Sequence, residues 1–391
     1  MSYRAIYAYA WDVGEIGAAS FADEVRALGL DTVTLAGSYH AGKFIRPKGR
    51  DGKVYFPEDG TVYFDADPKR YGRLKPLANS LNQKHDLFHE LADTGLAANA
   101  WMVLLHNTRL GLAHPDVTVE NAFGDRYVYS LCPSSPDARE YAVALCKDVT
   151  ETTPVMGISV ESPGFAPYAH GFHHEFALMR QNRWFDNQMG LCFCPHCLKG
   201  AAATGIDAAG LRDQIREDVE SWLASEFDIP DDMAEAFWLA DTRSGGALNA
   251  FLAWRCDVVT SLVSEIRSAI RKDAALAVIP SVARPTAGSW YEGTDLKALA
   301  EAGSIIEACF YEPSAARVRA DAWDVRRRVG AAKLRGILRP AYPDLQSRGE
   351  VVAAAEALRD TGIGEIAFYN YGHLRRGNLA WIADALAVFG D

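Results

Sequence analysis

The sequence lacks the features that mark membrane, secreted, fibrous and disordered chains. No apolar run reaches the roughly 18 residues that a membrane-spanning helix needs. The opening residues MSYRAIYAYAWDV have neither the basic nor the apolar segment of a signal peptide, so we expect a cytoplasmic protein without a membrane partner. Fixed-period repeats and low-complexity tracts are also missing. With 49% hydrophobic and 23% charged residues, the chain is suited to a large buried core.

Basic residues are in deficit. The 391 residues contain 40 Lys and Arg against 51 Asp and Glu, which gives a formal net charge of -11. Proteins that bind nucleic acid neutralise phosphates with positive charge, so nucleic acid is excluded as an expected partner. The sequence leaves the oligomeric state open, a homo-oligomer included.

Cysteine is scarce, and its distribution argues against a disulfide framework. The chain has seven cysteines, an odd number, and three of them fall in the short segment LCFCPHC. The spacing C-x-C-x2-C brings Cys192, Cys194 and Cys197 within reach of one tetrahedral ion. Cys132, in YSLCPSSP, is the best candidate for a fourth ligand, and His196, His174 or a carboxylate are the alternatives. We therefore expect a structural zinc and no organic cofactor.

Short β-branched or aromatic runs alternate with amphipathic stretches along the chain. This alternation predicts an α/β fold in which helices cover a parallel sheet. Eight strand–helix units predict a (β/α)8 TIM barrel. The expected strands are Ala5–Ala10, Thr32–Ala36, Ala98–Leu105, Gly157–Val160, Leu276–Ile279, Ile305–Tyr311, Leu334–Leu338 and Glu365–Tyr369. The expected helices are Ser20–Leu28, Lys75–Thr94, Pro136–Thr150, Leu248–Arg271, Asp295–Glu301, Ala315–Gly330, Arg348–Asp360 and Asn378–Phe389.

Two connections are too long to be plain loops. Residues 37–74 after the second strand, and residues 161–247 with the cysteine motif after the fourth, read as insertions into one barrel that spans residues 1–391. Both leave from C-terminal strand ends, the face on which barrel enzymes carry their sites. We expect them to wall a pocket.

The predicted strand tips carry carboxylates, hydrogen-bond donors and aromatic rings. This mixture is suited to a small carbohydrate, whose hydroxyls need hydrogen bonds and whose ring stacks on aromatic faces. We expect Trp11, Tyr39 and Tyr311 to stack on the sugar. The polar candidates for substrate binding are Asp12, His40, His106, Asn107, Arg109, His170, His173, Arg284, Asn370 and His373.

Cleavage of a glycosidic bond needs two carboxyl groups. Glu161 ends the apolar run MGISV, where partial burial would raise its pKa toward that of a general acid, so we predict this role for it. For the nucleophile or base, Glu312 and Asp344 are the candidates, with Asp12 as a further alternative. Each could equally serve as a loop ion pair or helix cap.

Several segments together resemble a family of uncharacterised glycoside hydrolase-like (β/α)8 barrels. They are TLAGSYHAGKF with VYFPEDGTVYF, WMVLLHNTRLG, NAFGDRYVYSLCPSSPDAREY, GISVESPGFAPYAHGFHHE, LCFCPHC and IAFYNYGHL, and they cover most of the chain. The resemblance implies sugar chemistry. Retaining barrel families carry one carboxylate on strand four, matched here by Glu161, and another on strand seven. No glutamate occupies that second tip, which leaves the nucleophile and the stereochemistry open.

Three functions follow from these patterns. The first is a glycoside hydrolase acting on a glycoside or oligosaccharide. The second is a metal-dependent lyase or isomerase of a sugar or sugar acid, which would use the histidines of HGFHHE and bind a carboxylate through Arg109 or Arg284. The third is a carbohydrate-binding barrel without catalysis. Metal bound at the pocket would favour the second, and sugar affinity without turnover would favour the third.

Overall fold

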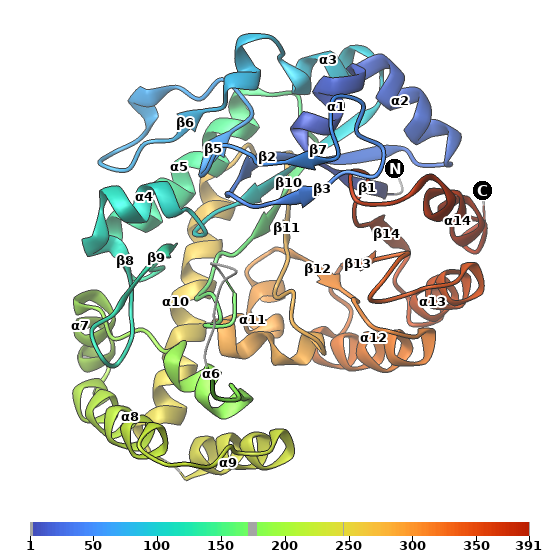
Figure 1. Ribbon diagram of the computed structural model, residues 1–391. Coiled ribbons are helices and arrows are strands. Elements are labelled where there is room, and N and C mark those ends of the chain that lie inside the picture. The colour runs from blue at the N-terminus through green and yellow to red at the C-terminus, as the bar shows by residue number, and fades with distance from the viewer. Residues whose placement is uncertain (1–2, 171–177, 245, 391) are drawn as a thin grey trace.

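The computed structural model describes residues 3–170, 178–244 and 246–390. Eight parallel strands form a closed barrel, because β1 pairs with β14 on one side and with β2 on the other (Figure 1). The predicted (β/α)8 fold is confirmed. The barrel strands are β1 (Arg4–Ala8), β2 (Thr32–Tyr39), β7 (Ala97–Val103), β10 (Gly157–Glu161), β11 (Ala275–Val278), β12 (Ile305–Cys309), β13 (Leu334–Leu338) and β14 (Glu365–Phe368).

Helices form a ring around the barrel, each with its apolar side turned to the strands (Figure 1). In the described part of the chain, no helix is long and apolar enough to cross a membrane. The helices of the ring are α1 (Ala10–Ile16), α2 (Ala18–Ala27), α3 (Leu87–Asp93), α5 (Pro136–Thr152), α10 (Ala247–Ala269), α11 (Leu296–Glu301), α12 (Ala315–Val329), α13 (Arg348–Asp360) and α14 (Arg376–Ala387).

One predicted helix is largely wrong. Of the stretch expected to be helical over Lys75–Thr94, only α3 is an α-helix, and it begins where the Asp86 carboxylate accepts a hydrogen bond from the backbone of His89. The preceding residues form the short strand β6 (Leu77–Ala78) and a 3-10 turn over Ser80–Gln83. Strand β6 pairs with a neighbouring strand, which competes with helix formation there.

The excursion after β2 lies over the rim of the barrel. Its first part is an antiparallel hairpin of β3 (Phe44–Ile45) and β4 (Val54–Tyr55). Strand β5 (Thr61–Val62) then extends the sheet beside the C-terminal end of β2, and a 3-10 turn over Pro68–Arg70 leads toward β6. Phe44 and Tyr55 pack on the barrel core, so the hairpin is fixed over the mouth.

A second hydrophobic core lies beside the barrel. It joins the segment after β7, which contains α4 (Thr108–Ala113), a 3-10 turn over Pro115–Val117 and the antiparallel strands β8 (Thr118–Glu120) and β9 (Arg126–Leu131), to the insertion after β10. Figure 1 shows the insertion helices as a lobe below the barrel, alongside α10. They are α6 (Arg183–Met189), α7 (Pro195–Ala203), α8 (Ala208–Leu223) and α9 (Asp231–Arg243).

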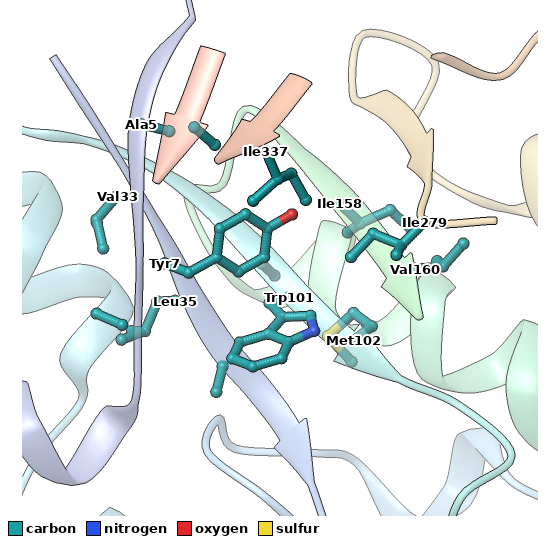
Figure 2. Close-up of a cluster of buried hydrophobic side chains, with 14 of the residues drawn as sticks. Ala5, Tyr7, Val33, Leu35, Trp101, Met102, Ile158, Val160, Ile279 and Ile337 are labelled. Carbon is teal, nitrogen blue, oxygen red and sulfur yellow. The ribbon is translucent and has the colours of Figure 1, made fainter. Parts of the chain in front are cut away.

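The barrel interior is layered. In the lower layer, the fully buried Glu307 of β12 accepts a hydrogen bond from the Tyr3 hydroxyl at 2.7 Å and lies 3.8 Å from Arg335. Above it, Tyr7 and Trp101 meet edge to face with their ring centroids 5.2 Å apart (Figure 2). Because side chains alternate along each strand, the next inward position of β10 after Ser159 is Glu161. The core thus forms the floor beneath that carboxyl group.

Candidate functional site

Glu161 ends β10 and points into the mouth of the barrel. The next residue, Ser162, has φ of 54°, the only positive φ among the described residues other than glycine, so the chain turns sharply there. The indole Nε1 of Trp101, on the neighbouring strand β7, donates a hydrogen bond to Oε2 of Glu161 at 2.6 Å. Burial raises the pKa of Glu161 to about 7, although the indole bond acts in the opposite direction.

A cavity of about 280 Å³ lies beside this carboxyl group. Its floor is the upper layer of the barrel core, and its wall includes residues of the excursion after β2. This arrangement of apolar walls with a few polar groups is typical of small-molecule sites. The lining residues are Tyr7, Tyr39, His40, Ala41, Gly42, Lys43, Phe44, Trp101, Glu161, His170, Ile279, Val282, Cys309, Tyr311, Ile337, Arg339 and Tyr369.

Tyrosine hydroxyls form a hydrogen-bonded cluster at one side of the cavity. The Tyr9 hydroxyl lies 2.9 Å from that of Tyr369, 3.3 Å from that of Tyr39 and 3.1 Å from Nε2 of His373. The tyrosines come from three different strand ends, so the cluster ties them together. It also fixes two of the rings that line the cavity.

Glu292 carries a second carboxyl group next to Glu161, and both residues are half-buried. It ends the 3-10 helix of Thr286–Glu292, between β11 and α11, and it lines a small hollow together with Glu161 and Ser281. The pKa of Glu292 is raised to about 8, chiefly by burial and also by the charge of Glu161, while a hydrogen bond from the Ser281 hydroxyl and the charge of the Arg255 guanidinium act in the opposite direction. The two carboxyl groups therefore interact electrostatically.

Backbone contacts hold the segment after β10 against Glu292. The backbone N–H of Phe165 donates to the carbonyl oxygen of Glu292 at 2.9 Å. A Cβ atom at Gly164 would lie 2.2 Å from that same oxygen, so only glycine permits this approach. Gly293 has φ of 82°, and a Cβ there would lie 2.8 Å from Val259. These two glycines allow the two carboxyl-bearing segments to lie side by side.

A larger hollow of about 580 Å³ opens on the outer side of Glu292. It is lined by Glu292, His170 and Val282, and by residues of α6 and α9 that include Arg183 and Asp231. His170 and Val282 also line the cavity beside Glu161 and the small hollow, so the three spaces are contiguous. Glu161 borders the ring-sized cavity, and Glu292 borders the open one.

Glu312 and Asp344, the partners expected from sequence, lie elsewhere. Glu312 is buried after β12 with its Oε2 2.5 Å from Nε of Arg317. Asp344 is fully buried between Arg284 and Arg339. Neither lines the hollow with Glu161 or the cavity beside it in the part of the chain described.

Four of the expected substrate-binding residues line the cavity beside Glu161: Tyr39, His40, His170 and Tyr311. His106 lies behind His40, with the two rings stacked and 4.0 Å between their centroids. His173 lies outside the described residues, as do His174 and Glu175, so the predicted histidine cluster is represented only by His170.

The other expected contacts have structural partners. Asn107 caps α4 by accepting from the N–H of Leu110 at 2.9 Å, and Arg109 donates to the carbonyl of Lys75 at 3.0 Å. Trp11 stacks on Tyr9 beneath the hairpin, with 4.3 Å between ring centroids.

Three more lie close to the mouth. Asp12 pairs with Arg46 at 3.1 Å, and burial raises its pKa to about 6. The side chain of Asn370 accepts from the N–H of Gly372, and His373 bonds to Tyr9 and to the carbonyl of Ile45.

Sequence reasoning missed Glu292, Trp101, Arg339 and Tyr369. The alternation of side chains could have identified Trp101 and Arg339, because Trp101 has an inward position in a predicted strand and Arg339 lies at the tip of another. Glu292 had none, since it lies 14 residues beyond β11 in a turn-rich segment and reaches the site only through tertiary contacts.

Four cysteines gather in the second core. Cys132 follows β9, and Cys192, Cys194 and Cys197 lie at the start of α7. Their sulfur atoms all lie within 4.8 Å of one another and are buried. The Sγ of Cys132 is 3.5 Å from that of Cys197, 3.6 Å from that of Cys194 and 3.8 Å from that of Cys192. A tetrahedral ion with metal–sulfur bonds of about 2.3 Å gives edges of about 3.8 Å, so the cluster could hold a metal ion.

Backbone donors surround these sulfurs. The N–H of Glu120 points to Sγ of Cys192 at 3.5 Å, and the N–H of Ser134 points to Sγ of Cys132 at 3.4 Å. Hydrogen bonds with the other three cysteines hold the pKa of the Cys194 thiol well below its usual range, whereas burial raises the pKa of the Cys132 and Cys197 thiols. Donors of this kind stabilise thiolate, the form that binds metal.

Comparison with solved structures identifies the same fold in known enzymes. The chain aligns over 99% of its length with the glycoside hydrolase domain of PgaB (BpsB) from Bordetella bronchiseptica, at 14% identity and a TM-score of 0.57, and covers 99% of that domain. The fold is that of glycoside hydrolase (β/α)8 barrels. The expected resemblance is thereby confirmed for the fold. The sequence matches no protein-family model and no curated protein.

Two longer enzymes share this barrel. An alpha-L-fucosidase isoenzyme from Paenibacillus thiaminolyticus aligns at 11% identity and a TM-score of 0.54, and a beta-galactosidase from the psychrophilic Marinomonas ef1 at 9% and 0.55. Each alignment covers 99% of this chain, which spans 49% of the fucosidase and 59% of the galactosidase.

Proposed function

We propose that the protein is a glycoside hydrolase whose reacting carboxyl groups are Glu161 and Glu292. The observation that carries this proposal is that both groups line one hollow between a ring-sized cavity and an open one, with raised pKa values. A glycosidic bond at that junction would have a carboxyl group on either side. The glycoside hydrolase fold of the structural neighbours supports this reading.

We assign the two roles from position and proton affinity. Glu161 borders the cavity that would hold the sugar ring and has the lower pKa, and the Trp101 N–H favours its charged form. Glu292 borders the space for the leaving group and has the higher pKa, so it keeps its proton. Glu292 is thus the general acid that protonates the departing oxygen, and Glu161 is the nucleophile or base. This reverses the role expected for Glu161 from sequence.

The reaction breaks the bond between the anomeric carbon and the glycosidic oxygen. The oxygen leaves with the proton of Glu292, and a water molecule supplies the hydroxyl that joins the anomeric carbon, either directly with Glu161 as base or after attack by Glu161 itself. The sugar ring that contains the anomeric carbon would lie against Tyr39, Tyr311 and Tyr369.

The pH dependence of kcat/KM tests this assignment. We expect a bell-shaped profile with its acidic limb at about pH 7 and its basic limb at about pH 8, because activity needs Glu161 charged and Glu292 protonated. The measurement is the initial hydrolysis rate of an aryl glycoside at low concentration. A profile with no basic limb below about pH 9 contradicts the role given to Glu292.

Trp101 is a positioning residue that acts through Glu161, and the variant Trp101→Phe tests this role. The variant removes the hydrogen bond that favours the charged form of Glu161, so the acidic limb moves upward by about one pH unit. The basic limb stays in place, which a merely structural defect would not produce. An unchanged acidic limb in a folded variant would show that the indole bond does not act on Glu161.

A panel of aryl glycosides, free sugars and sugar acids decides between the three functions expected from sequence. Release of the phenol or fluorophore in the presence of a chelator supports a hydrolase. Metal-dependent conversion of free sugars or sugar acids would favour the lyase or isomerase, and sugar binding without turnover would favour a binding barrel. Wild-type protein that neither cleaves nor converts any member of the panel contradicts the enzyme proposal.

We further propose that Cys132, Cys192, Cys194 and Cys197 bind one structural zinc ion. Four thiolate ligands leave no open coordination position, so the ion would take no part in hydrolysis. Its role would be to join the segment after β7 to the insertion after β10, whose helices wall the open hollow. Closing a long loop is entropically costly, and a metal bond at its base offsets that cost.

A further inference from the structure

The cavity beside Glu161 has more basic than acidic side chains on its walls. Among the described residues that line it, Glu161 is the only acidic one, whereas Lys43 and Arg339 are both basic. Lys43 belongs to the excursion after β2, and Arg339 directly follows β13. Basic groups from separate elements thus converge on a space sized for one sugar ring.

The guanidinium of Arg339 is rigidly held but not neutralised. Its Cζ lies 3.8 Å from the centroid of the Tyr311 ring, and Nη1 lies 3.2 Å from Oδ2 of Asp344. Asp344 is fully buried and is shared with Arg284, whose Nη1 lies 3.1 Å from Oδ1. One carboxylate therefore faces two guanidinium groups. Nε of Arg339 is buried and has no hydrogen-bond partner within the described ranges.

Lys43 supplies a second positive charge at the rim. It is exposed and makes no ion pair with any residue that the structure describes. Lys43, Arg339 and Arg284 carry positive charges, whereas Asp344 and the ionised Glu161 carry negative ones. The surroundings of the cavity therefore have one positive charge in excess. A neutral sugar would offer no counterpart to that charge, whereas a carboxylate would.

We propose that the sugar ring bound in this cavity carries a carboxylate, so that the substrate is a glycoside of a uronic acid. The proposal rests on the glycosidase function given above and specifies its substrate class. A planar guanidinium held by stacking binds a carboxylate with two parallel hydrogen bonds, which a hydroxymethyl group cannot replace. The cavity of about 280 Å³ has room for the sugar ring that carries this carboxylate. The reaction is the same hydrolysis, with water as the only co-substrate.

Pairs of substrates that differ only at this group test the proposal. The wild-type rate is measured on 4-nitrophenyl glucuronide and glucoside, and on the galacturonide and galactoside, in both anomeric forms. We expect kcat/KM for one uronide to exceed that of its neutral counterpart by about 100-fold or more, because a polar site rejects a substrate that leaves it unpaired. Lys43→Gln should lower kcat/KM for the uronide about fivefold more than it lowers kcat/KM for the neutral substrate. Lys69→Gln, an exposed lysine in the 3-10 turn over Pro68–Arg70, is the control and should change neither.

The outcomes separate this proposal from the function on which it rests. Cleavage of a neutral glycoside at least as fast as its uronide, with Lys43→Gln indifferent to the charge, overturns the carboxylate proposal and leaves the glycosidase. If no substrate is cleaved, calorimetry with methyl glucuronide and methyl glucoside gives the answer. Binding of the acid alone supports the carboxylate site while the hydrolase assignment fails. Binding of neither, or of the neutral sugar alone, overturns the carboxylate proposal.

Discussion

Replacing Glu161 by Ala is expected to lower kcat by about 10³-fold or more on every substrate, activated leaving groups included. The reason is that Glu161 borders the ring-sized cavity and acts at the anomeric carbon, so a good leaving group does not bypass its loss. The measurement is the hydrolysis rate of the best aryl glycoside and of its dinitrophenyl analogue. If the enzyme retains configuration, added azide should restore part of the rate in this variant.

Glu312→Gln is the matched control. Glu312 also follows a barrel strand and is buried, but it pairs with the exposed side chain of Arg317 and does not line the cavity. We expect its kcat to stay within about threefold of the wild type, and circular dichroism should show that both variants are folded. Loss of activity in Glu312→Gln comparable with that in Glu161→Ala would restore Glu312 as the partner and contradict the site described above.

The second large effect concerns the cysteine cluster. Cys192→Ala should abolish metal binding and lower Tm by about 10 °C or more, because four ligands become three and the join between two segments of the second core is lost. The main effect should be the loss of thermal stability. KM for a small glycoside should change little, because the ligands do not line the cavity beside Glu161. Elemental analysis of the wild type should find about one zinc per chain.

Cys146→Ala provides the control for the lost sulfur. Cys146 is a fully buried free cysteine in α5, outside the cluster, so the substitution removes the same atom without touching a ligand. A decrease in Tm of about 4 °C or less is expected there. Wild-type protein purified without chelator that contains no metal, or equal destabilisation in the two variants, would contradict the zinc assignment.

The sequence was sufficient for the barrel because each strand carries its own local pattern. Apolar runs that alternate with amphipathic stretches, and that are bounded by turn residues, identified all eight barrel strands. Gly29, Gly303 and Gly362, each with a positive φ, follow the ends of helices. The pattern failed over Lys75–Thr94, where strand pairing overrode helical spacing of leucines. Local propensity is a weak guide wherever a tertiary contact competes with it.

The candidate site was predictable only where it is built from strand tips. Glu161 and Tyr39 end barrel strands, Tyr311 lies two residues beyond one, and the closed sheet brings such positions to one mouth. Glu292 is different. It is brought to Glu161 by the turn at Gly293 and by the approach of Gly164 to its backbone, a contact between residues more than 120 positions apart. No periodicity in the sequence records a contact of that kind.

Cys132 shows the intermediate case. Its spacing from the other three cysteines carries no motif, yet a three-ligand motif implies a missing fourth ligand, and the common face of the barrel limited the candidates. The structure brings its sulfur to within 3.8 Å of each of the others.

In the proposed mechanism, Glu292 gives a proton to the leaving group while Glu161 acts at the sugar. Its most direct test is the dependence of kcat/KM on leaving-group acidity in Glu292→Ala, across aryl glycosides from dinitrophenyl to phenyl. We expect the variant to lose less than about 10-fold on the dinitrophenyl glycoside and more than about 10²-fold on the phenyl glycoside, because only the poor leaving group needs the proton. A loss that is uniform across the series, or no loss at all, would contradict this mechanism.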